Sequence, residues 1–86
     1  MNLLWTATAW DQYIWFQEYE PKLVKKLNRL IRECQRTPFE GTGKPEPLKH
    51  EFSGHWSRRT TDEHRLVYRV EQEQIVIVGC RFHYDQ

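Results

Sequence analysis

The chain has 86 residues, of which 38% are hydrophobic, 14% aromatic and 29% charged, and its formal net charge is +1. A chain of this length predicts one small domain over residues 1–86 with a modest core. Two cysteines are too few for a disulfide framework, and no apolar run is long enough to cross a membrane, so we expect a cytoplasmic protein with reduced thiols.

The N-terminal half predicts a strand followed by two helices. Residues 2–6 are typical of a short strand, and Thr8 is a candidate N-cap for a helix over residues 9–18. Pro21 suits the first turn of a second helix. Apolar residues then recur at intervals of three and four, which predicts a strongly amphipathic helix. They are Leu23, Val24, Leu27, Leu30, Ile31 and Cys34.

The opposite face of this second helix is basic. Residues 22–36 contain six Lys/Arg side chains and only one acid, Glu33. Such a patch can contact phosphates even when the net charge is near zero. A solvated outer face is the alternative interpretation, and the sequence leaves both open. The candidate RNA contacts on this face are Lys25, Lys26, Arg29 and Arg32.

The C-terminal half predicts four strands, over residues 48–52, 56–61, 64–70 and 75–84, separated by turns. The order of elements indicates an α+β fold, with two N-terminal helices packed on one face of a mostly antiparallel, twisted sheet.

The last two strands should place their apolar rows on the same face of this sheet. These rows are Leu66, Tyr68 and Val70 on one strand and Val76, Val78, Cys80 and Phe82 on the other. We therefore expect Leu66 opposite Cys80, Tyr68 opposite Val78 and Val70 opposite Val76. The other face then forms a basic surface that ends in a histidine. It would contain Arg65, Val67, Arg69, Ile77, Gly79, Arg81 and His83.

A proline-rich loop over residues 43–50 connects the helices to the sheet. Glu46 lies between Pro45 and Pro47, with Lys44 and Lys49 close in sequence. Each proline restricts its own φ and the residue before it, so the backbone of Glu46 has little freedom. A carboxylate positioned in this way could act as a general base. A stiff, solvated link between helix and sheet is the other interpretation.

Arg65, His83 and Tyr84 should meet Glu46 and Lys49 at one end of the sheet. A carboxylate and a histidine can move the two protons of metal-free RNA cleavage, and cationic groups can stabilise the charge on phosphorus. A zinc site is disfavoured, because Cys80 and His83 point to opposite strand faces and no other ligands are suitably spaced. We expect no metal and no cofactor.

Five segments of the chain resemble the YoeB toxins, the Txe group within the RelE-like superfamily. They cover residues 36–41, 43–50, 53–59, 63–68 and 80–84. The resemblance implies the RelE-like microbial RNase fold and ribosome-dependent cleavage of mRNA. It also implies Glu46 as the general base, His83 as the general acid and Arg65 as the group that stabilises the phosphorane. Lys49 would assist, and Tyr84 would hold the substrate.

The resemblance further implies a YefM-like antitoxin as partner, with the ribosome and mRNA as targets and operator DNA bound only by the toxin–antitoxin complex. We also assign Lys44, Arg59 and Arg81 to RNA or ribosome contact, and the aromatic-rich chain is compatible with a homodimer. Two other classes remain open: a non-catalytic RNA- or ribosome-binding module and a DNA-binding co-repressor. Glu46 distinguishes the nuclease from these two classes, because a protein that only binds nucleic acid does not need a carboxylate next to the phosphates.

Overall fold

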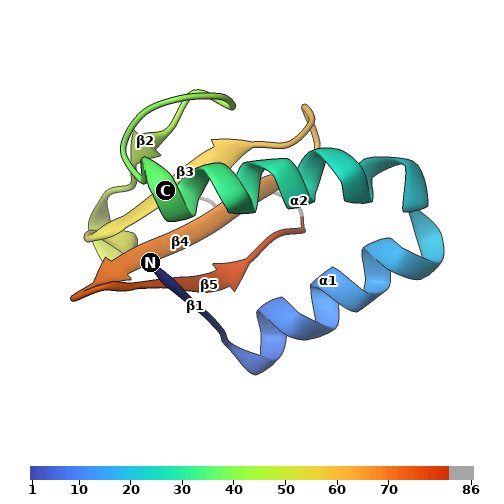
Figure 1. Ribbon diagram of the computed structural model, residues 1–86, viewed down its shortest axis with the longest axis horizontal. Coiled ribbons are helices and arrows are strands. Elements are labelled where there is room, and N and C mark those ends of the chain that lie inside the picture. Colours follow the sequence, from blue (N-terminus) through green and yellow to red (C-terminus); the bar gives the residue numbers. More distant parts are fainter. Residues whose placement is uncertain (82–86) are drawn as a thin grey trace.

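The computed structural model describes residues 1–81; residues 82–86 are outside the described part. The elements in chain order are β1 (Asn2–Trp5), α1 (Ala7–Tyr19), α2 (Pro21–Arg36), β2 (Glu46–Pro47), the 3-10 helix η1 (His50–Phe52), β3 (His55–Arg59), β4 (Arg65–Glu71) and β5 (Gln74–Gly79). The strands form one sheet in the order β1-β5-β4-β3-β2. Strand β1 is parallel to β5, and the other pairs are antiparallel. Both helices pack against one face of this sheet (Figure 1), which confirms the predicted α+β architecture.

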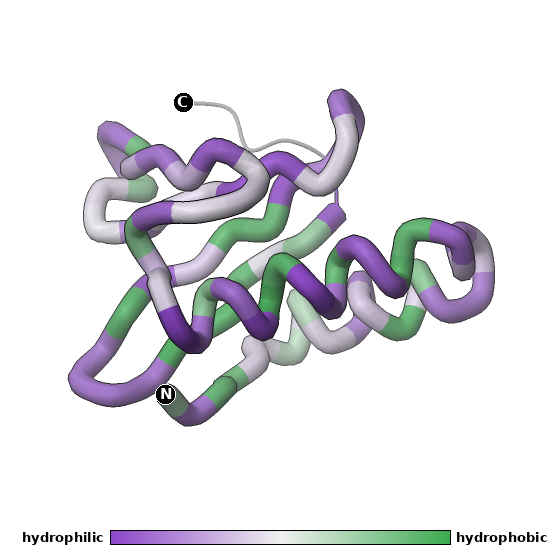
Figure 2. Tube along the Cα trace, turned by 45° about the horizontal axis from the view of Figure 1, so that its top comes forward, coloured by the Kyte–Doolittle hydropathy of each residue, from purple (hydrophilic) through white to green (hydrophobic). Residues whose placement is uncertain are grey.

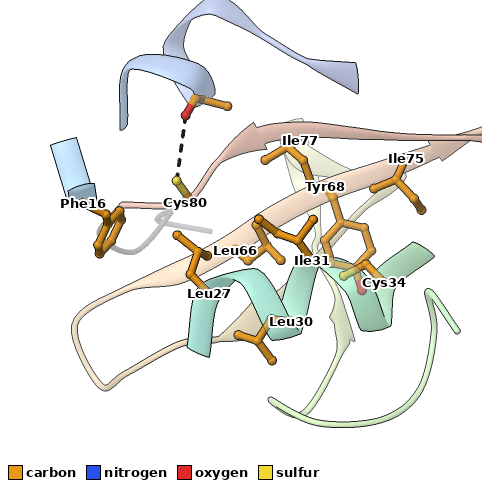
Figure 3. Packing of buried hydrophobic residues seen from close by; sticks show 11 residues of the cluster. Phe16, Leu27, Leu30, Ile31, Cys34, Leu66, Tyr68, Ile75, Ile77 and Cys80 are labelled. Atoms are coloured by element: carbon orange, nitrogen blue, oxygen red, sulfur yellow. Dashed lines mark hydrogen bonds between the residues drawn. The ribbon is translucent and has the colours of Figure 1, made fainter. Parts of the chain in front are cut away.

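The core lies between α2 and the central strands. Helix α2 alternates apolar and hydrophilic residues at helical spacing (Figure 2), as predicted. Its apolar side packs against β4 and β5 (Figure 3), and each such side chain stabilises the fold by about 1.5–3 kcal/mol relative to an exposed one. The buried members are Leu27, Leu30, Ile31 and Cys34 from α2, and Leu66, Tyr68, Ile75 and Ile77 from the strands.

Both cysteines belong to this core. Burial raises the pKa of Cys34 to about 11 and that of Cys80 to about 12. The thiols therefore remain protonated at neutral pH and behave as small apolar groups. Within residues 1–81, neither helix has the length and apolar character that a membrane-spanning segment requires.

Helix α1 begins earlier than predicted. Thr6, rather than Thr8, is the N-cap, and its hydroxyl accepts a hydrogen bond from the amide of Ala9 at 3.1 Å. Thr6 also donates its own amide to the carbonyl of Ile77 in β5. Thr6 therefore both ends the contact with the sheet and begins helix α1. Its bond to Ile77 links residues far apart in the chain, so the local sequence could not predict it.

The predicted register between the last two strands holds only near the start of β4. Val67 lies opposite Gly79, as the predicted pairing of Leu66 with Cys80 requires, but an irregularity between Val67 and Tyr68 displaces the rest of the ladder by one residue. Tyr68 lies opposite Ile77 and Val70 opposite Ile75, because Glu71 pairs with Gln74 across a turn of two residues. Such tight turns need positive φ, and Gln72 adopts a φ of 54°.

This displacement of the ladder puts other side chains than predicted on the two faces. Ile75 and Ile77 pack toward the helices in place of the predicted Val76 and Val78. The opposite face is not a purely basic surface, because Val67 and Val76 are buried there. Cys80 does reach the core, as predicted, because the irregularity beside Val78 restores the predicted alternation at Gly79. The thiol of Cys80 turns toward the carbonyl of Ala9 (Figure 3).

The predicted strand over residues 48–52 is also wrong. The strand is Glu46–Pro47, and residues 50–52 form η1. The amide of Leu48 bonds to the carbonyl of His55 at 2.9 Å, so the chain must reverse between these two residues. A positive φ of 58° at His50 and a turn bond from the amide of Ser53 to the carbonyl of His50 achieve this reversal.

Candidate active site

Glu46 and Arg65 form the centre of the candidate site. Arg65 Nη1 lies 3.0 Å from Glu46 Oε1 and 3.2 Å from the hydroxyl of Ser57. The Arg65 side chain is 17% exposed, whereas that of Glu46 is 56% exposed. The base candidate is therefore open to solvent, while its cationic neighbour is held against the sheet.

Strand pairing places these three residues together. Glu46 in β2 lies opposite Ser57 in β3, and Arg65 begins β4 opposite Arg59 at the end of β3. Pro47 can occupy β2 because β2 is an edge strand, where a missing amide donor is tolerated. The segment before β2 is anchored too, since the amide of Arg59 donates to the carbonyl of Gly43 at 2.7 Å.

Lys49 lies close to Glu46 along the same surface. Glu46, Pro47, Leu48 and Lys49 line a shallow hollow of about 250 Å³. Leu48 is buried beneath it, whereas Lys49 is exposed. A carboxylate, an ammonium group and a guanidinium group thus share one surface of the molecule.

The Glu46–Arg65 pair lies on the side of the sheet that faces away from the helices. Leu66 and Tyr68 point into the core beneath α2, and alternation along β4 sends Arg65 to the opposite face. The basic side of α2 consequently points in a different direction from this pair. Lys25, Arg29 and Arg32 are exposed there, and Lys26 is half-buried.

The remaining cationic candidates have different surroundings. Lys44 is exposed in the proline-rich loop at a φ of 52°. Arg59 is also exposed and lies 3.7 Å from Asp62. The guanidinium of Arg81 stacks 3.7 Å above the ring of Trp15 in α1. Arg81 thus lies near the end of the sheet that holds Arg65, because Trp15 also contacts His64.

His83 and Tyr84 lie outside the described residues. The chain leading to them is anchored on α1, because the amides of Cys80 and Arg81 donate to Gln12 Oε1 at 2.7 and 3.2 Å. Among residues 1–81, no three His, Cys, Asp or Glu side chains converge as metal ligands would.

Comparison with known proteins identifies the chain. The model of the YoeB-like toxin of bacterial type II toxin–antitoxin systems matches residues 5–84. The chain belongs to this family.

Relatives match the chain over nearly its whole length. Toxin YoeB of Escherichia coli strain K12 is 56% identical, covering 98% of this chain and all of the relative. Toxin YoeB of Synechocystis is 49% identical over the full length of both chains.

Two solved structures share the fold at high identity. The YoeB/ParE toxin from Agrobacterium tumefaciens is 51% identical with a TM-score of 0.94, covering 98% of this chain and 100% of the other. The YoeB–YefM complex from Staphylococcus aureus contains a chain that is 42% identical with a TM-score of 0.88, covering 98% of each. The RelE/YoeB fold expected from the sequence is therefore confirmed.

A buried arginine behind the site of this YoeB-like chain was not predicted from the sequence. Arg58 follows Ser57 in β3, is fully buried and points to the helix side of the sheet. Its Nε lies 3.2 Å from the hydroxyl of Tyr68, and its Nη1 lies 3.4 Å from Glu33 of α2. A signal was present, because strand alternation puts Arg58 in the same inward row as Trp56, where a charged residue must find partners.

Proposed function

We propose that this chain is the toxin of a type II toxin–antitoxin pair and acts as a ribosome-dependent mRNA endoribonuclease that inhibits translation. The observation that carries the proposal is the exposed carboxylate of Glu46, 3.0 Å from the guanidinium of Arg65. An exposed ion pair of this kind contributes only about 0–1 kcal/mol to stability, so folding alone does not account for it.

In the proposed reaction Glu46 takes the proton from a ribose 2′-hydroxyl. The 2′-oxygen attacks the adjacent phosphorus, and the bond from phosphorus to the 5′-oxygen breaks. His83 gives a proton to that leaving oxygen. The products are a 2′,3′-cyclic phosphate and a free 5′-hydroxyl, and the proton balance needs no metal ion and no cofactor.

The cationic groups would stabilise the negative charge that develops on phosphorus. Arg65 is oriented for this by the hydroxyl of Ser57, and Lys49 would assist from the edge of the hollow. The role of Tyr84, which would hold the substrate, and the role of His83 rest on the family resemblance.

Binding to the ribosome would use the other basic side chains. Lys25, Lys26, Arg29 and Arg32 of α2, with Lys44, Arg59 and Arg81, are proposed to contact ribosomal or messenger RNA. Phosphate neutralisation by such groups makes binding strongly salt-dependent. Cleavage would occur in the decoding site of cytoplasmic ribosomes.

We further propose a YefM-like antitoxin as the neutralising partner, because the Staphylococcus aureus relative is seen as a YoeB–YefM complex. We also propose a homodimer, because the YoeB relative from Staphylococcus aureus is seen as a dimer. Operator DNA would be bound only by the toxin–antitoxin complex.

The test is to incubate the purified protein with mRNA, with and without programmed ribosomes, and to map the cut sites. We expect cutting within the decoding site only when ribosomes are present, and unchanged cutting in a chelator specific for transition metals. Efficient cutting of free RNA would refute ribosome dependence, and loss of cutting in the chelator would refute the metal-free mechanism. Binding to ribosomes without any cut would instead favour a non-catalytic module.

A further inference from the structure

The loop between α2 and the Glu46 segment is held by one buried side chain. Arg58 Nη1 donates to the carbonyl of Thr42 at 3.2 Å, and Nη2 donates to the carbonyls of Thr37 and Glu40. A single guanidinium thus binds three carbonyls from six consecutive residues. The planar fork of arginine suits this task, and a lysine ammonium could not reproduce it.

Two further side chains complete the cluster around Arg58. Glu33 Oε1 accepts the amide of Thr42 at 2.6 Å while it faces Arg58, and the hydroxyl of Tyr68 donates to the carbonyl of Pro38. The hydrogen bond from the Thr42 backbone lowers the pKa of Glu33, so this carboxylate is ionised at neutral pH. Within residues 37–42, four carbonyls and one amide are therefore bound by Arg58, Glu33 and Tyr68.

The loop backbone approaches this cluster too closely for larger residues. A Cβ on Gly41 would lie 2.0 Å from Glu33 Oε1, and Gly41 has a φ of 116°. A Cβ on Gly43, at a φ of 87°, would lie 3.0 Å from the carbonyl of Arg59 and 3.2 Å from Cβ of Arg58. The positive φ at both positions favours glycine, and a larger residue at either one would disturb the contacts of the cluster.

The cluster and the candidate site are the two sides of one strand. Ser57 contacts Arg65 on the open face, whereas the next residue, Arg58, holds the loop on the helix face. The anchored loop ends at Gly43, and Glu46 follows three residues later, already paired with Ser57. The backbone that carries Glu46 is thus held at Gly43 and again at Glu46 itself.

We propose that Arg58, together with Glu33 and Tyr68, is a positioning group for the cleavage reaction. It orients the loop that carries Glu46 and does not itself touch the RNA. The inference rests on the proposed nuclease function. Its consequence is that disturbing the cluster slows the chemical step on bound ribosomes while ribosome binding persists, because misplacing a base by about 1 Å can cost about 10²-fold in rate.

The test uses Arg58→Lys, which keeps the charge but removes the fork, and Glu33→Gln, which keeps an oxygen for the Thr42 amide. Glu71→Gln is the matched control, because Glu71 pairs with Arg69 at the opposite end of β4. Three quantities are measured below the melting temperature of every variant. These are the single-turnover cleavage rate at saturating programmed ribosomes, the ribosome affinity, and the hydrogen exchange of residues 37–49.

We expect Arg58→Lys to cleave about 10²-fold more slowly and Glu33→Gln about tenfold more slowly. Affinity should stay within about twofold, since only an interaction in the transition state is weakened. Exchange of residues 37–49 should accelerate in both variants and not in Glu71→Gln.

The inference is overturned if both folded variants cleave at the parental rate, or if rate and affinity fall together. Should Arg58→Lys fail to fold, Glu33→Gln decides the question, because the Glu33 side chain is 18% exposed and Arg58 keeps its three loop carbonyls in this variant. A parent protein that does not cut at all refutes the proposed function itself, whatever the variants do.

Discussion

Two arginine–carboxylate pairs lie on opposite faces of the same part of the sheet, and they differ in almost every respect. Arg58 and Glu33 are 3.4 Å apart on the helix face, with the arginine fully buried and bonded to three carbonyls. Arg65 and Glu46 are 3.0 Å apart on the open face, with the carboxylate more than half exposed. The two arginines belong to adjacent antiparallel strands, β3 and β4.

The difference shows which pair stabilises the fold and which is available for chemistry. A buried ion pair is costly to disrupt, because removing one partner leaves an uncompensated charge and unpaired backbone groups. An exposed pair contributes little to stability, so its residues can be replaced without unfolding the chain. Arg58 therefore stabilises the loop that leads to Glu46, and Glu46 and Arg65 remain available for the proposed reaction.

The largest expected effect is on the open face. Glu46→Gln removes the proposed base and should reduce the single-turnover cleavage rate by about 10²–10⁴-fold. Its melting temperature should match that of the parent, because the side chain is 56% exposed. Glu51→Gln, an exposed carboxylate in η1, is the control and should cleave normally. A Glu46→Gln protein with the parental rate would assign the base role elsewhere.

The next largest effect is the difference in stability between two variants in which Arg58 or Arg65 is replaced by methionine. Arg58→Met should lower the free energy of unfolding by about 3–5 kcal/mol, because Glu33 and three carbonyls are left without their partner. Arg65→Met should lower it by about 1 kcal/mol or less, although it should abolish cleavage. Urea unfolding of both variants measures the difference. Equal decreases in stability would mean that the contrast between buried and exposed pairs is wrong.

A smaller effect concerns the helix side of the molecule. Charge reversal at Lys25, Lys26, Arg29 and Arg32 should weaken ribosome association and lower the slope of log K against log salt by about 0.7 for each phosphate that is no longer neutralised. Glu46→Gln should leave association almost unchanged. Titrating each variant with ribosomes at several salt concentrations distinguishes the loss of binding from the loss of cleavage. If the α2 variant binds like the parent at every concentration, that face is only solvated.

The smallest effect is a pH dependence of stability. The pKa of Glu33 is lowered from its ordinary value of 4.5 by the Thr42 amide, so its ionised form stabilises the folded state. This stabilisation is present above the ordinary pKa and disappears as the pH falls through the folded-state pKa. Glu33→Gln should therefore be less stable than the parent at neutral pH, and the difference in stability should narrow as the pH falls below 4.5. Thermal unfolding across this range, with Glu71→Gln correcting for the removal of one charge, measures this difference.

Local patterns predicted much of the fold. The spacing of Leu27, Leu30, Ile31 and Cys34 correctly indicated the buried side of α2, because helical periodicity is an intrinsic property of the segment. Strand alternation also put Leu66 and Tyr68 inside and Arg65 outside. The neighbourhood of Glu46 and Arg65 was anticipated from residue types and the family resemblance, and the structure brings the two side chains together.

Three predictions of structural detail failed. The cap at Thr6 depends on a bond to Ile77, and the reversal at His50 depends on where Leu48 meets β3. The register of β4 and β5 was missed from Tyr68 onward, because a turn of two residues and the irregularity beside Val78 make Ile75 and Ile77 the inward row. Only the cap at Thr6 depends on a residue far away in sequence, whereas the other two errors arose at turns and at a strand irregularity.

The sequence by itself determined the two helices, most of the strands and the amphipathic side of α2, since these follow from residue type and spacing. Strand alternation indicates that Arg58 points inward, but only the tertiary structure decided that partners await it there. Arg58 and Arg59 are adjacent in sequence, yet one is enclosed by Glu33, Tyr68 and the loop carbonyls and the other is exposed. Burial of a charge is favourable only where several partners from separate segments converge on it, and that convergence is a property of the folded chain.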